Sequence, residues 1–102
     1  MSDLEEQFTR ELLGLLQNAE QAGISDPSLC RAVEKNGGAK ALKYRFARNQ
    51  ASLGLEDLAR AGKLSLSPEA LAVQPKYASL FTDDEVNFCF DLLCQYGFYN
   101  GN

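Results

Sequence analysis

No recognisable motif in this chain pairs the carboxylate, lysine and thiol side chains that could carry enzyme chemistry. The 102 residues include no histidine, which excludes Ser-His-Asp and Cys-His nucleophile systems, histidine metal ligands and an imidazole pH switch. The glycine pair before Lys40 lacks the spacing of a phosphate-binding P-loop. We therefore expect a protein that is not an enzyme and that uses no cofactor and no metal.

The three cysteines form neither a disulfide pattern nor a metal-binding pattern. Cys89 and Cys94 are five residues apart, which on a helix turns them about 140° away from each other. An odd number of cysteines is typical of a reducing compartment. We expect Cys30, Cys89 and Cys94 to be buried thiols that act as small apolar side chains.

The sequence also predicts where the protein is found. No apolar run approaches the ~20 residues of a membrane span, and the acidic first residues have none of the features of a secretory signal. We expect a cytoplasmic protein that makes no membrane contact.

Three consecutive carboxylates, Asp83, Asp84 and Glu85, could be taken for a metal or acid–base cluster. They follow Thr82, and a threonine three residues before a glutamate is the pattern of a helix-capping box. No calcium-binding loop spacing surrounds them. We therefore interpret them as the beginning of a helix, where negative charge stabilises the helix dipole.

The charge is distributed unevenly along the chain. The net charge is −4, but residues 31–63 hold eight basic and three acidic residues, net +5, so the remainder carries −9. The free backbone N–H groups expected at the Gly37-Gly38 turn would add an anion seat. The competing interpretation is a solvated helix face that the acidic first helix balances. The candidate contacts for an anion or a nucleic acid are Lys35, Lys40, Lys43, Arg45 and Arg48.

The segment 86–96 is apolar around nearly its whole helical circumference. Such a helix is either central in the core or half exposed to a partner. Three aromatic residues at its end, Tyr96, Phe98 and Tyr99, either fold back onto the core or form a protein interface or a homodimer interface. The sequence leaves both interpretations open.

Helical periodicity predicts the elements that position these residues. Helices are expected over 2–22, 27–36, about 38–48, 52 or 54 to 62, 68–73 and 82–96, with Ser25-Asp26-Pro27 as the start of the second. Residues 63–67 alternate between polar and apolar, so we expect an extended connector there. No linker or repeat divides the chain, and residues 1–102 are expected to form a single compact all-α domain of five or six helices, with short connections and no convincing sheet.

Four motifs follow one another between residues 38 and 99: a helix rich in Ala, Lys and Arg, then LEDLARAGKLSLSPEAL, then LFTDDE, and finally YGF. Together they resemble a small helical module of unassigned function in bacterial proteins. The resemblance implies a helical fold and a bacterial or mobile-element origin, and it supplies no catalytic residue.

The sequence thus predicts a small non-enzymatic interaction module that binds a protein partner or itself through its apolar C-terminal helix. The alternative is nucleic-acid binding through residues 31–48. If the helices over 27–36 and 38–48 met at about 100°, they would resemble a helix-turn-helix. No small-molecule substrate is expected.

Overall fold

The first helix, α1 (Asp3–Gln21), contributes one apolar stripe to the core. The structure is a computed structural model that describes residues 3–51 and 54–97. Phe8, Leu12, Leu16 and Ala19 recur every three or four residues and are all buried, as the spacing predicts. The first turn is acidic, which suits the positive end of the helix dipole.

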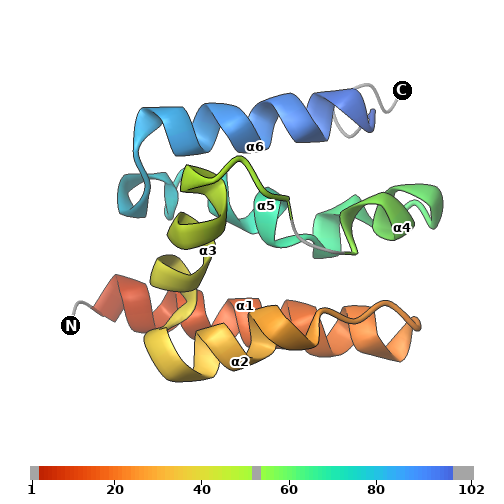
Figure 1. Ribbon diagram of the computed structural model, residues 1–102, viewed down its shortest axis with the longest axis horizontal. Helices are drawn as coiled ribbons and strands as arrows, with labels where there is room; N and C mark the ends of the chain where they lie inside the picture. The colour runs from red at the N-terminus through yellow and green to blue at the C-terminus, as the bar shows by residue number, and fades with distance from the viewer. Residues whose placement is uncertain (1–2, 52–53, 98–102) are drawn as a thin grey trace.

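Two further helices pack on α1. Helix α2 (Pro27–Asn36) lies alongside α1, and α3 (Gly38–Ala47) runs crosswise from the end of α2 toward the opposite side of the molecule (Figure 1). Gly37 links them with φ +88, a left-handed value that glycine adopts without strain. At the crossing, a Cβ on Gly38 would lie 3.1 Å from side-chain carbons of Phe8 and Leu12, so a glycine there permits close approach.

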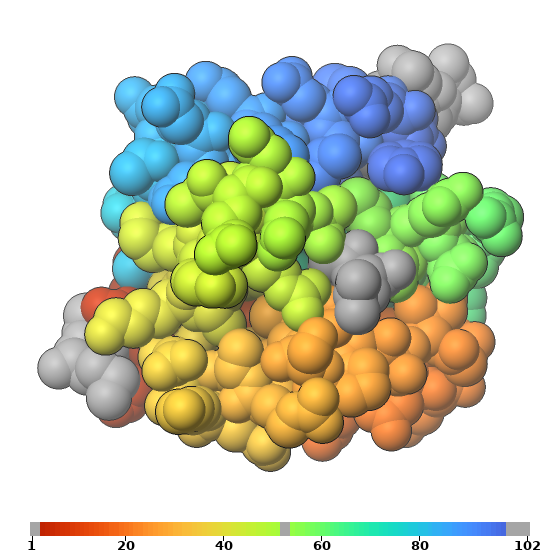
Figure 2. Space-filling model, in the orientation of Figure 1, coloured from red at the N-terminus to blue at the C-terminus, as the bar shows by residue number. Residues whose placement is uncertain are grey.

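The second half of the chain consists of short helices followed by one long helix. These are α4 (Leu55–Arg60), the 3₁₀ turn η1 (Leu64–Leu66), α5 (Pro68–Ala72), the 3₁₀ turn η2 (Ala78–Leu80) and α6 (Asp83–Gln95). Helix α6 lies on the opposite side of the molecule from α1 and α2, with α3 and α5 between them (Figure 1). Figure 2 shows α3 at the middle of the viewed face, between α6 above and α2 below.

The core is continuous from α1 to α6. The Phe8 ring contacts Tyr77 and Phe81, with centroids 5.0 and 5.5 Å apart, and Phe46 on α3 contacts Phe81 and Phe88. A second cluster joins Ala19 to buried leucines of α4, η1 and α6. Helix α3 is thereby anchored through Leu42 and Phe46, and its other side is left for contacts with solvent or a ligand.

The predicted fold class is confirmed, since the described part of the chain holds six α-helices and no strand. The capping box is also present: the Glu85 N–H donates to the Thr82 hydroxyl, and the Thr82 N–H donates to the Glu85 carboxylate. The extended connector over 63–67 is wrong. Leu64 is buried, and both the N–H and the hydroxyl of Ser67 donate to its carbonyl, which closes a 3₁₀ turn.

The expectation that all three cysteines are buried is correct only for Cys89. Cys30 is partly buried, and burial raises the pKa of the Cys30 thiol and of the Cys89 thiol. Cys94 is exposed, because it lies on the outward side of α6 whereas Cys89 faces the core. The thiols of Cys89 and Cys94 therefore point to different sides of α6, as their spacing of five residues predicts.

Candidate functional site

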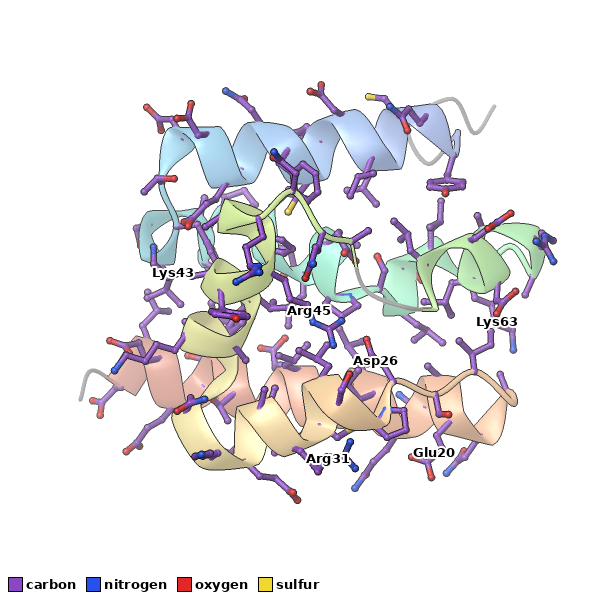
Figure 3. All side chains as sticks on the ribbon, viewed as in Figure 1. Glu20, Asp26, Arg31, Lys43, Arg45 and Lys63 are labelled. Atoms are coloured by element: carbon purple, nitrogen blue, oxygen red, sulfur yellow. The ribbon has the colours of Figure 1, made fainter. Side chains whose placement is uncertain are left out.

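Arg45, one of the five candidate anion contacts, is committed to a carboxylate inside the protein. Its Nη1 and Nη2 donate to the two carboxylate oxygens of Asp26, at 2.6 and 3.1 Å, and Nη2 also donates to the Ser28 hydroxyl. Asp26 is only 5% exposed and caps α2 by accepting the Leu29 N–H. Figure 3 shows Arg45 reaching from α3 toward Asp26 at the start of α2. Arg45 therefore joins two helices, and its charge is neutralised.

Lys43 is committed in the same way on another side of α3. Its Nζ lies 2.9 Å from a Glu85 carboxylate oxygen and donates to the Leu80 carbonyl. Burial favours the neutral form of Glu85, but the N–H of Thr82 and the ammonium of Lys43 outweigh it, so the pKa of Glu85 is lowered. Lys43, another of the five candidate anion contacts, is therefore directed toward α6 and η2, and its charge is paired.

Two of the predicted residues remain together on the exposed side of α3. Lys40 and Arg48 are both exposed and lie one turn on either side of Tyr44, the large apolar side chain with the greatest exposure, 64%, among the described residues. The Arg48 guanidinium carbon lies 5.1 Å from the centroid of the Tyr44 ring, and its Nη1 donates to the Tyr44 hydroxyl. We call Lys40, Tyr44 and Arg48 the α3 stripe. Tyr44 was absent from the predicted set, although its spacing of four from both basic residues was visible in the sequence.

A groove of about 510 Å³ runs beside the α3 stripe, between α2 and α3. This volume is within the range of ligand-binding clefts, about 300–1,000 Å³. Small side chains, Ala32 and Ala41, lie between polar ones, which opens the space. The residues that line the groove are Ser28, Ala32 and Asn36 from α2, Lys40, Ala41, Tyr44 and Arg45 from α3, and Gln50 after it. We call this the α2–α3 groove.

Lys35 lines a second hollow, of about 470 Å³, on the other side of Asn36. Arg10 of α1 and two glutamates, Glu6 and Glu34, also line it, so its charges are mixed. The two hollows share Asn36 as a common wall. Lys35 therefore stands next to the α2–α3 groove rather than in it.

The predicted anion seat at the Gly37-Gly38 turn is wrong. The Gly37 N–H donates to the Val33 carbonyl at 2.8 Å, and the Gly38 N–H donates to the Thr9 hydroxyl at 2.9 Å. Since α1 crosses at this point, its Thr9 side chain occupies the position that an anion would need. Gly38 itself is buried.

The C-terminal candidates are only partly described. Tyr96 is 40% exposed at the end of α6, and Phe90, earlier on the helix, is 38% exposed. Exposed acidic residues, Asp84 and Asp91, share the outer side of α6. Phe98 and Tyr99 lie outside the described residues.

The part of the chain that the structure describes contains no group of three or more potential metal ligands. Within 3–51 and 54–97, no helix combines the length and the apolar character that crossing a bilayer requires. The chain matches no protein-family model, no curated protein and no solved structure. The resemblance of residues 38–99 to a bacterial helical module stays a prediction.

Proposed function

We propose that the protein is a non-enzymatic module that binds nucleic acid through the α3 stripe and the α2–α3 groove. The observation that carries the proposal is the placement of the exposed Tyr44 between Lys40 and Arg48 at the edge of a groove of about 510 Å³. Basic side chains neutralise phosphates, and an aromatic ring between them contacts bases.

Charge on this face supports the proposal in spite of the overall charge of −4. Among the described residues, neither Lys40 nor Arg48 forms an ion pair, and the same holds for Arg31 and Lys35 on the neighbouring helix. Within 31–48, the basic residues that form ion pairs are Lys43 and Arg45, and both pair with carboxylates of other segments of the fold. Lys40 and Arg48 therefore remain to attract a polyanion at the α3 stripe, and Lys35 stands next to the groove.

A charge-reversal pair tests this proposal. Lys40→Glu and Lys63→Glu change the net charge equally and both replace exposed lysines, but only Lys40 lines the groove. Lys63 lies beyond α4, far from Lys43 and α3 in Figure 3. In fluorescence anisotropy with labelled oligonucleotides at low ionic strength, we expect salt-sensitive binding that Lys40→Glu weakens and Lys63→Glu largely preserves. Equal effects of the two variants would contradict the proposal, as would absence of binding.

A second candidate function is binding of a protein partner, or of a second copy, through α6. The exposure of Phe90 and Tyr96 on this helix favours it. Asp84 and Asp91 share the outer side of this helix, and their charge favours a basic partner over a second copy, because two copies of this surface would repel each other. Light scattering coupled to size exclusion tests this preference: a monomer at every concentration is the expected result, and a concentration-dependent dimer that Tyr96→Asp disrupts contradicts it.

We further propose that the protein acts in the cytoplasm. Three free thiols, one of them exposed as Cys94, support a reducing compartment. Quantifying the reactive thiols in protein freshly isolated from its native cells tests this assignment, with oxidation of Cys94 as the contrary result.

A further inference from the structure

We infer that the α2–α3 groove takes one unpaired base of a single strand, stacked on Tyr44, so that the protein binds single-stranded nucleic acid in preference to duplex. This inference rests on the proposed function and assigns the class of nucleic acid that the same site accepts.

The first argument is the state of the Tyr44 ring. It is 64% exposed at the groove edge, yet its orientation is fixed by the Arg48 guanidinium, which packs over it and donates to its hydroxyl. A single exposed ring is common on protein surfaces, so what distinguishes Tyr44 is its contact with Arg48 at the edge of a groove. A ring held in place in advance loses little conformational freedom when a second flat ring stacks on it.

The second argument is the shape of the groove. Its lining includes Ala32 on α2 and Ala41 on α3, and these short side chains leave room beside the Tyr44 ring. A nucleobase is flat and apolar on its faces but polar on its edges. The groove offers matching groups, since Tyr44 and the alanines supply apolar surface while Asn36 and Gln50 supply amide donors and acceptors.

The third argument is the placement of positive charge along α3. Lys40 and Arg48 lie one helical turn before and after Tyr44, about 12 Å apart along the helix axis. A strand that crosses α3 at Tyr44 can therefore place a phosphate on either side of the stacked base. In single-strand recognition the same combination of basic side chains and a stacking ring recurs.

Duplex nucleic acid uses this surface less well. Its base faces are already stacked on one another, so Tyr44 has no face to contact unless a base leaves the helix. The link between α2 and α3 is the single residue Gly37, whereas the helix-turn-helix of duplex readers has a turn of roughly three or four residues. An acidic peptide would satisfy Lys40 and Arg48 but would leave the aromatic ring and the amides unused.

The test compares three variants on a short labelled oligothymidylate and on a duplex that contains it, by fluorescence anisotropy at low ionic strength. Tyr44→Ala removes the ring from an exposed helix position and should weaken single-strand binding by about fivefold or more, the lower end of what one stacked base contributes. Tyr44→Phe keeps the ring and should bind within about twofold of the unmodified protein. Tyr96→Ala removes another exposed tyrosine and should bind normally.

Tyrosine emission gives an independent readout, because the chain has four tyrosines and no tryptophan. Stacking should quench the emission of the unmodified protein, and Tyr44→Phe should lose most of that quenching while it keeps its affinity.

The contrary results are distinct. If duplex binds as tightly as the single strand and Tyr44→Ala changes nothing, the stacking inference is overturned while the proposed function stands. If oligoglutamate displaces the labelled oligonucleotide as well as the unlabelled oligonucleotide does, the groove recognises negative charge alone. That result would overturn the stacking inference and make an acidic protein the partner. If neither nucleic acid binds, the proposed function itself fails.

Discussion

Replacing Arg45 with methionine should destabilise the protein strongly while leaving the α3 stripe in place. The substitution conserves much of the side-chain volume and removes the guanidinium that donates to both carboxylate oxygens of Asp26. Asp26 is 5% exposed and would stay buried with the Leu29 N–H and the Ser28 hydroxyl as donors. Neutral donors such as these do not replace a cation beside a buried carboxylate.

The structure sets the expected size of the effect. Breaking one side of a buried ion pair costs about 3–5 kcal/mol, and the donors that Asp26 keeps, which include the Leu29 N–H and the Ser28 hydroxyl, place Arg45→Met near the lower end. Domains of this size have about 5–15 kcal/mol of stability in total. Since 1 kcal/mol corresponds to about 4–8 °C in a domain of about a hundred residues, the Tm should fall by more than about 10 °C.

Two further variants make the result specific. Lys43→Met breaks an ion pair that is more exposed, with 39% of the lysine side chain accessible, and should cost less than about 1 kcal/mol. Adding Asp26→Ser to Arg45→Met removes the stranded charge and keeps an N-cap residue, so it should recover a large part of the loss. Urea unfolding followed by circular dichroism measures all three. If Arg45→Met costs no more than Lys43→Met, the Asp26–Arg45 pair does not hold α2 against α3.

Two other predictions concern α1. Gly38→Ala should destabilise the protein by about 1–3 kcal/mol, because the new Cβ would lie 3.1 Å from side-chain carbons of α1 and 3.2 Å from the α1 backbone. Gly14→Ala, whose Cβ would meet nothing within 4 Å, should stabilise the protein by up to about 1 kcal/mol. Equal stabilities of the two variants in calorimetry would contradict the close packing of Gly38 against α1. Tyr77 and Lys76 donate to Glu11 and lower the pKa of its carboxyl. The ionised Glu11 carboxylate thus contributes stability at a pH above the ordinary pKa of a glutamate, and this contribution is lost as the pH falls through the lowered pKa of Glu11 in the folded state. Glu11→Gln should therefore flatten the acid limb of the stability profile, and urea midpoints that fall as steeply in the variant would contradict this.

The helix boundaries were predictable because local signals set them. Asp26 and Pro27 begin α2, and Thr82 with Glu85 begins α6, through hydrogen bonds that span only three residues. Gly97 follows α6 with φ +80, as expected for a glycine after a helix end. The turn over 63–67 was not predictable from its alternation, because the burial of Leu64 decides its shape.

The site was only partly predictable for a related reason. Lys43 meets Glu85 across 42 residues, and Arg45 meets Asp26 across 19, so no local pattern reveals which basic residues are neutralised. Similarly, the Thr9 hydroxyl reaches the Gly38 N–H across 29 residues and closes the expected anion seat. The position of Tyr44 between two basic residues was visible in the sequence, but its exposure follows from the other side of α3 being buried.

The most direct test of the groove as the binding site is a backbone amide NMR titration of the unmodified protein with a short oligothymidylate at low ionic strength. We expect the largest shift changes along the groove lining, at Ala32, Asn36, Lys40, Tyr44 and Gln50, with small changes along α6. Largest changes on α6 or on the acidic first turn of α1, or a spectrum that does not change, would contradict nucleic-acid binding at the α2–α3 groove.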